Sequence, residues 1–178
     1  NTPGDIFLGN VTVNNDELIS EEKELPISRL VSRVNIKLKG HREYTESILS
    51  LPVLPDDDEF TFVVETSHLS VEFLGNRCNT PVYYYIKDIL TSDEMCEVST
   101  FNMFSNLEGT DVIIHIYHKD TLIDTISEAI SETEGNTTSS LISYSGKLLE
   151  VFINYQAGLT VVLQNTNWWE GEWLWKDF

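Results

Sequence analysis

The sequence is poor in basic residues: 11 lysines and arginines stand against 29 aspartates and glutamates among 178 residues, a net charge of −18. This excess argues against nucleic acid or an anionic membrane surface as a partner. The sequence has no run of the roughly 18 apolar residues that a membrane helix needs. It also has no secretory signal and no initiator methionine, since it opens NTPGD. We therefore expect a processed or trimmed chain.

Cysteine is scarce, and the motifs of the common enzyme classes are missing. Cys78 and Cys96 have no metal-ligand spacing and leave open one disulfide or two separate thiols. G-x-S-x-G, H-E-x-x-H, the P-loop and the Gly-rich dinucleotide turn are absent. His115 and His118 would point to opposite faces of a strand, which is poor geometry for a metal. We predict a protein that is not an enzyme and has no cofactor, although a glycosidase stays open because its two acids need not be close in sequence.

What the sequence does contain is a series of short segments in which apolar and polar residues alternate, as is typical of β-strands. These segments lie at residues 32–38, 60–65, 69–73, 112–117, 149–155 and 159–163, and residues 81–90 form another predicted strand that is rich in aromatic and β-branched residues. The connection Gln156 to Gly158 favours a hairpin with a left-handed third position. The acidic run Pro55 to Glu59 lacks Ca²⁺-loop spacing and is interpreted as a solvated loop. Asp124 is interpreted as the cap of a short helix that contains Ile126 and Ile130.

The pattern predicts an all-β protein of two tandem sandwich-like units. The polar segment Thr91 to Glu94 is the candidate boundary between them. The expected units are therefore residues 1–90 and residues 91–178. No helix longer than about three turns is expected.

The stretch LPISRLVSRVNIKLKG, residues 25–40, changes its period halfway. Its first half has apolar residues at helical spacing, whereas from Ser32 onward the alternation is that of a half-buried strand. Four of the eleven basic residues gather here: Arg29, Arg33, Lys37 and Lys39. The structural interpretation is that they face outward from a strand whose other face is buried, where positive charge also discourages wrong edge pairing.

The order of these segments resembles the FimB-type fimbrial anchor family, within the FimA-like adhesin superfamily of Bacteroidetes pili. The family segment "D-x-F-x-G" is matched by Asp5, Phe7 and Gly9. The strand that follows it is matched by Ser28, Arg29, Leu30, Val31, Arg33 and Val34. The closing hairpin and tryptophan are matched by Glu150 to Tyr155, Leu159 to Leu163 and Trp168. Each motif is short, and the order and spacing over nearly the whole chain carry the resemblance.

The resemblance implies two tandem transthyretin-like β-sandwiches in an exported lipoprotein at the outer membrane or cell surface. It implies a non-enzymatic pilus anchor or assembly subunit that joins other pilus subunits by β-strand addition. The lipobox cysteine of the family is absent from this chain, and family members have further strands before "D-x-F-x-G". We therefore expect the first unit to lack N-terminal strands and to have an open edge.

The resemblance also gives the basic cluster a second interpretation. Shaft pilins of this superfamily are cut after an arginine in this region by an arginine-specific protease, which opens a groove for a neighbour's strand. Arg29 and Arg33 are therefore candidate processing sites. Anchors resemble the pilins here without necessarily being cut, so the structural and the processing interpretations both stay open.

Two further sequence patterns concern carbohydrate: one suggests a surface that binds it, and the other suggests sites where it is attached. All four tryptophans lie within eight residues near the C-terminus, and Trp169, Trp173 and Trp175 share a parity, so an extended tail would form one aromatic stripe. Such a stripe suits host or bacterial surface glycans, and the alternative function is a carbohydrate-binding module. Separately, Thr121 and Thr125 each stand between an aspartate and an apolar residue, which resembles the acceptor pattern for periplasmic O-glycosylation in Bacteroidetes.

Overall fold

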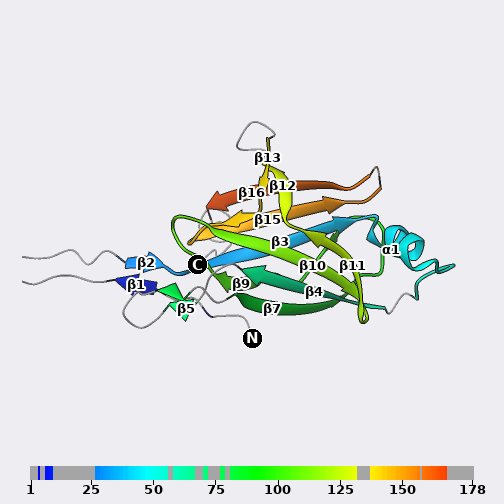
Figure 1. The fold of residues 1–178 in the computed structure, drawn as a ribbon, viewed down its shortest axis with the longest axis horizontal. Coiled ribbons are helices and arrows are strands. Elements are labelled where there is room, and N and C mark those ends of the chain that lie inside the picture. The colour runs from blue at the N-terminus through cyan, green and yellow to red at the C-terminus, as the bar shows by residue number, and fades with distance from the viewer. Residues whose placement is uncertain are drawn as a thin grey trace, which may run out of the picture.

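The computed structural model describes residues 4, 7–9, 27–55, 58–66, 70–71, 77–78, 81–131, 137–156 and 158–167. Within these ranges the chain forms strands and one short helix, and the longer strands build two sheets that pack on a common core (Figure 1). The predicted all-β class is therefore confirmed. No helix in the described part of the chain is long and apolar enough to span a membrane.

The first sheet has the strand order β11-β10-β4-β7, and all its neighbouring pairs are antiparallel. Its members are β4 (Glu59–Thr66), β7 (Val82–Ile89), β10 (Thr110–His118) and β11 (Thr121–Ile126), with β14 (Ile142–Ser143) paired to the start of β10. Burial alternates along β4 and β10, because one face of the sheet covers the core and the other is solvated. The strands predicted at 60–65, 81–90 and 112–117 are confirmed.

The second sheet has the order β13-β12-β16-β15-β3, and both β8 and β9 pair with the far side of β3. Its members are β3 (Val31–Lys39), β8 (Cys96–Glu97), β9 (Phe101–Phe104), β12 (Glu128–Ser131), β13 (Thr137–Ser140), β15 (Lys147–Asn154) and β16 (Thr160–Asn167). Strands β15 and β16 form the predicted antiparallel hairpin, and Gly158 has the expected positive φ of 89°. In contrast, β3 runs parallel to β15, and β12 runs parallel to β16.

Two short antiparallel ladders complete the described strands. One pairs β1 (Phe7–Gly9) with β2 (Ile27–Arg29), and the other pairs β5 (Ser70–Val71) with β6 (Arg77–Cys78). The segment predicted as a strand at 69–73 thus contributes two paired residues to the described structure.

Each of the two large sheets combines strands from both of the ranges that the sequence predicts as separate units, 1–90 and 91–178. Strand β4 lies between β7 and β10, and β3 lies between β15 and the β8–β9 edge. Buried side chains from both ranges, such as Ile36 and Phe60 from the first and Ile114 and Ile153 from the second, belong to one hydrophobic cluster. The strands of the two large sheets therefore share a single core.

Strand β3 keeps its predicted buried face, whereas its other face is partly covered, since Asn35 is buried there as well. Val34, Ile36 and Leu38 are fully buried, while Lys37 on the other face forms a 3.0 Å ion pair with Glu150 of the neighbouring β15. The helical spacing in residues 27–34 does not produce a helix, because β2 and β3 occupy this stretch. Pairing with strands on both sides outweighs the local pattern.

The helix is in a different place from the one predicted. Residues 124–130 lie in β11 and β12, so the helix expected after Asp124 is wrong. The observed helix, α1 (His41–Leu49), follows Gly40, whose φ of +69° and close approach to Gln156 leave no room for a side chain. Its start is capped from a distance: Asp93 Oδ1 accepts a hydrogen bond from the backbone N of Arg42, at 2.7 Å. A cap 51 residues away gives no local sequence signal.

Candidate functional site

The longest open strand edge in the described structure belongs to β7. This strand pairs with β4 along its whole length in one unbroken register, from Val82 opposite Thr66 to Ile89 opposite Glu59. Among the described residues, no strand pairs with its other side. The other outer strands of the two sheets, β11, β13, β8 and β9, have six, four, two and four residues, against eight in β7. Strand β7 therefore offers the longest row of main-chain groups for another strand.

Side chains, instead of main-chain pairing, link this edge to the opposite sheet. The backbone N of Phe104 donates to the hydroxyl of Tyr84, at 3.0 Å. Asp88 Oδ2 accepts hydrogen bonds from the backbone N and the hydroxyl of Ser99, at 2.8 and 2.9 Å. These contacts come from the inward face of β7 or from its end, so they hold the two sheets together without using the outer edge of the strand.

On the side of the sandwich away from β7, the chain itself connects the two sheets. Strand β11 ends at Ile126 and β12 begins at Glu128, so the chain passes from the first sheet to the second across a single residue, Ser127. The carbonyl of Ser127 accepts a hydrogen bond from the backbone N of Leu141, at 3.0 Å. The two sides of the sandwich thus differ, and β7 lies on the open one.

The solvent face of the first sheet carries a shallow trough of about 530 Å³. Its floor is formed by the small outward residues of β4, Thr61 and Val63. On one side stand Tyr83 and Tyr85 of β7, which are 46% and 69% exposed, and on the other stands Tyr117 of β10. The trough exists because short β-branched side chains on the central strand lie between long aromatic ones on its neighbours.

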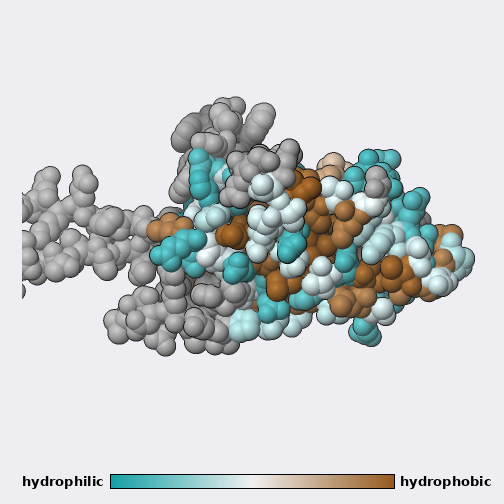
Figure 2. Space-filling model, turned by 45° about the horizontal axis from the view of Figure 1, so that its top comes forward, coloured by the Kyte–Doolittle hydropathy of each residue, from teal (hydrophilic) through white to brown (hydrophobic). Residues whose placement is uncertain are grey.

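Charged groups occupy both ends of this trough. At one end, Lys87 forms a 2.5 Å ion pair with Glu59, and both side chains are well exposed. At the other end, His115 Nε2 lies 3.4 Å from Glu65 Oε2, while its Nδ1 lies 3.1 Å from the hydroxyl of Thr125. On the face drawn in Figure 2, hydrophobic residues gather in patches that hydrophilic residues interrupt.

Both predicted glycosylation acceptors are on β11, and both are exposed. Thr121 begins the strand, directly after the turn at Lys119 and Asp120, whereas Thr125 lies within the strand opposite His115. Their surface positions suit modification, which stays a prediction. The side chain of Asp124 also has a structural contact, since its carboxylate accepts a hydrogen bond from the hydroxyl of Tyr155.

The candidate processing sites lie in paired strands. Arg29 is in β2, opposite Phe7 of β1. Arg33 is in β3, with Leu148 on one side and Asn102 on the other. A protease binds its substrate in an extended, unpaired form, so cleavage at Arg33 would require β3 to leave the sheet. Processing therefore stays a prediction that competes with the structural role of these residues.

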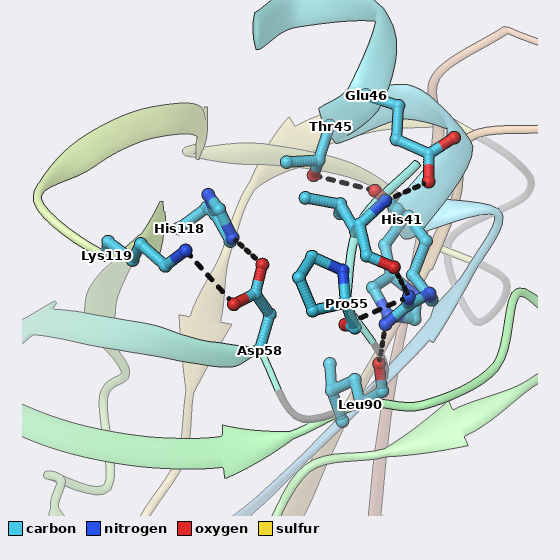
Figure 3. Close-up of polar contacts among 10 residues, drawn as sticks. His41, Thr45, Glu46, Pro55, Asp58, Leu90, His118 and Lys119 are labelled. Carbon is cyan, nitrogen blue, oxygen red and sulfur yellow. Dashed lines mark hydrogen bonds and ion pairs between the residues drawn. The ribbon is translucent and has the colours of Figure 1, made fainter. Parts of the chain in front are cut away.

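The sequence did not predict the buried polar cluster near the start of β4. Asp58, expected in a solvated loop, is only 7% exposed and accepts hydrogen bonds from His118 Nε2 at 2.7 Å and Lys119 Nζ at 3.1 Å (Figure 3). The hydrogen bond from His118 lowers the pKa of Asp58, outweighing the opposite effect of burial. Nothing in the acidic run distinguished Asp58 from its neighbours, because its partners are 60 residues away.

The guanidinium of Arg42 anchors the loop beneath the same cluster. It donates to the carbonyls of Leu90 at 3.0 Å, Leu54 at 2.6 Å and Pro55 at 3.1 Å (Figure 3). These hydrogen bonds hold the loops around the cluster in place. The described residues contain no group of three or more potential metal ligands. The contacts of the cluster join loops and strand ends of the protein to one another, which is a structural role, and we take the surface features of the first sheet as the functional candidates.

Three sequence predictions fall wholly or partly outside the described residues. Trp169, Trp173 and Trp175, the predicted carbohydrate platform, lie beyond residue 167, as does Trp168. The side chain of Cys78 is likewise not described, while Cys96 is a free thiol that donates to the carbonyl of Ser92.

The sequence matches the family model "Fimbrillin-A associated anchor proteins Mfa1 and Mfa2" over residues 1–170. Three solved structures are similar to the chain. The fimbrial anchor protein Mfa2 from Porphyromonas gingivalis is 12% identical, with a TM-score of 0.48, over 92% of this chain and 58% of that one. A Bacteroides ovatus protein assigned as an adhesin is 16% identical, with a TM-score of 0.48, over 92% and 59%. A Bacteroides uniformis protein assigned to cell adhesion is 11% identical, with a TM-score of 0.34, over 81% and 52%.

This chain thus spans between about half and three fifths of the length of these three structures. No curated protein matches its sequence.

Proposed function

This chain belongs to the family of fimbrillin-A associated anchor proteins, and we propose that it is an anchor or assembly subunit of a cell-surface pilus that acts by strand addition. In this mechanism a segment of a neighbouring subunit extends the first sheet along the outer edge of β7. The family is one of fimbrial components and not of enzymes, in agreement with the absence of catalytic motifs from the sequence. The observation that carries the proposed mechanism is the eight-residue edge of β7, unpaired among the described residues.

The character of this edge supports the mechanism. Natural sheets protect their edges with proline, bulges, short strands or charged side chains, and the two charged residues of β7, Lys87 and Asp88, lie only near its end. Strand β7 contains no proline, keeps an unbroken register with β4 and is among the longer strands of the fold. An added strand would gain main-chain hydrogen bonds along its length, and its alternate side chains would lie beside Tyr83 and Tyr85 on the solvent face.

The proposed partners are other exported pilus subunits, and the proposed location is the outer membrane or cell surface. Family membership supports both. Attachment of the native protein to the outer membrane through a lipid is part of the same proposal.

Proline substitution in β7 tests the mechanism. Successive backbone N–H groups of a strand point to opposite sides, so of Lys87→Pro and Asp88→Pro one removes a hydrogen bond to β4 and the other removes an N–H from the open edge. Thermal melting identifies the edge variant as the one whose stability equals that of its matched alanine variant, which lacks the same side chain. We expect this variant to fold and to lose binding to purified pilus subunits from the same host.

Lys87→Ala and Asp88→Ala are the matched controls, because they remove the same side chains and keep the N–H groups. Hydrogen exchange on the complex adds an independent readout: amides of β7 should gain protection, and amides of β11, the other edge of the sheet, should not. Full binding by the edge variant, or protection confined to β11, would refute strand addition at β7.

A further inference from the structure

We propose that the trough on the solvent face of the first sheet is a binding site for a neutral saccharide. The trough is the hollow with Thr61 and Val63 as its floor, Tyr83 and Tyr85 along one side and Tyr117 along the other. This site is separate from the backbone edge of β7 and from the C-terminal tryptophans, and the proposal does not depend on strand addition.

The exposed tyrosines are the first argument. Tyr83 and Tyr85 are two apart on β7, so both rings stand on the same face of the sheet, and they are 46% and 69% exposed. Their neighbour Tyr84 points the other way and is 4% exposed. Exposed aromatic rings in a row present flat apolar faces, which suit the C–H faces of sugar rings, while each phenolic hydroxyl can reach a sugar hydroxyl.

The spacing of the strands is the second argument. Tyr85 pairs with Val63, and Val63 pairs with His115, so these three residues form one row across β7, β4 and β10. The next row along contains Lys87, Thr61 and Tyr117. Since neighbouring strands lie about 4.8 Å apart, the two sides of the trough are separated by roughly 10 Å. That width admits a pyranose ring lying over the short side chains of β4.

The polar groups around the rings supply the third argument. Glu59 and Lys87 lie at one end with Lys119 and Asp120, and His115 lies at the other. Carboxylates accept hydrogen bonds, whereas the lysines donate them, and a ligand covered in hydroxyl groups uses both kinds. With two carboxylates against two lysines in the lining, the trough has no charge preference of its own. The net charge of −18 on the whole chain disfavours an anionic ligand.

The pairing of β4 argues against a peptide as the occupant of the trough. Strand β4 has β10 on one side and β7 on the other over nearly its whole length, so its main-chain groups are already paired. A peptide lying in the trough would find no strand edge there, and recognition would rest on side chains alone. Ring stacking with hydrogen bonds from side chains is the mode that a saccharide uses.

Isothermal titration calorimetry on the full chain tests the proposal. The probes are cellohexaose, xylohexaose, mannohexaose and chitohexaose at millimolar concentration, with oligogalacturonate as the anionic comparison and decaproline as the peptide comparison. We expect at least one neutral saccharide to bind and oligogalacturonate to bind more weakly. Tyr85→Ala should weaken the binding by about tenfold or more, and Tyr85→Phe should keep most of it because the ring remains.

Two controls make the outcome decisive. Leu159→Ala changes an exposed apolar residue outside the trough and should leave the affinity unchanged. The melting temperature of each variant shows that it is folded. The proposal is overturned if no neutral saccharide binds, if only decaproline binds, or if Tyr85→Phe loses as much affinity as Tyr85→Ala. It is also overturned if Trp173→Ala abolishes binding and Tyr85→Ala does not, since the site would then be the tryptophan stripe.

Discussion

The Nε2 atom of His118 lies 2.7 Å from Oδ2 of Asp58, and both residues are almost completely buried. This contact joins the end of β10 to the residue that precedes β4, and the 3.1 Å contact from Lys119 to the other carboxylate oxygen completes the pair. A buried carboxylate of this kind makes stability sensitive to acid.

We therefore predict that the Asp58 carboxylate stabilises the fold at neutral pH and that this contribution is lost in acid. Its pKa is lowered in the folded state, so the unfolded chain binds a proton more readily than the folded chain does. The contribution is complete above the unfolded pKa of about 3.9 and disappears as the pH falls through the lower folded value. Asp58→Asn should lower the free energy of unfolding by about 2 kcal/mol at pH 7.

Urea denaturation at several pH values measures this effect. The difference between the wild type and Asp58→Asn should shrink below pH 4, where the carboxylate becomes protonated first in the unfolded chain and, at lower pH, in the folded chain. Asp120→Asn, at an exposed neighbouring position, is the control and should follow the wild type. A constant difference across the pH range would contradict the assignment.

A second prediction concerns Arg42, whose three carbonyl partners lie in two different loops. Lysine retains the charge but cannot reproduce the planar set of donors. Arg42→Lys should therefore leave buried carbonyls unsatisfied and lower the free energy of unfolding by about 2 kcal/mol. Chemical denaturation checks this, with Glu43→Gln on the exposed side of α1 as the control. An effect no larger than that of the control would show that the loops keep their conformation without the hydrogen bonds from Arg42.

A third prediction concerns the hydroxyl groups of Ser32, Ser105 and Ser143, which form a closed ring of hydrogen bonds of 2.8, 3.1 and 2.7 Å. All three side chains are buried. A single Ser143→Ala leaves two hydroxyls without one partner each and should reduce stability by about 1–2 kcal/mol. Replacing all three by alanine should reduce it by less than the sum of the single effects. Strict additivity in thermal melts would mean that the three hydroxyls act independently.

A fourth prediction concerns O-glycosylation. Thr121 begins β11 next to an exposed turn, whereas the hydroxyl of Thr125 is within hydrogen-bond distance of His115. If both acceptors are used, we expect Thr121 to be modified to the greater extent, because its hydroxyl is the more accessible. Intact mass and peptide mapping of protein from the native host measure this, with Thr121→Ala as the comparison. An intact protein mass without added sugar would refute the prediction.

Predictions from the sequence succeeded where a local pattern was sufficient. The alternation in residues 60–65 and 112–117 identified strands with one buried face, because period-two burial is a property of the strand itself. The hairpin between β15 and β16 was visible in the same way, since Gly158 is the residue type that its positive φ favours. The outward position of Lys37 followed from the same alternation.

Contacts between distant residues decided the rest. Alternation shows which face of a strand is buried but not which strand lies beside it, so the parallel pairing of β3 with β15 had no local signal. Helix α1 depends on Asp93, and the burial of Asp58 depends on His118, both far along the chain. The trough, likewise, needs tyrosines of β7 and β10 on either side of Thr61 and Val63. By itself the sequence determined the all-β class and the inward face of each strand, because both depend on neighbours along the chain. Only tertiary pairing decided the open edge, the trough and the buried carboxylate, because these depend on residues brought together from about 20 to 60 positions apart.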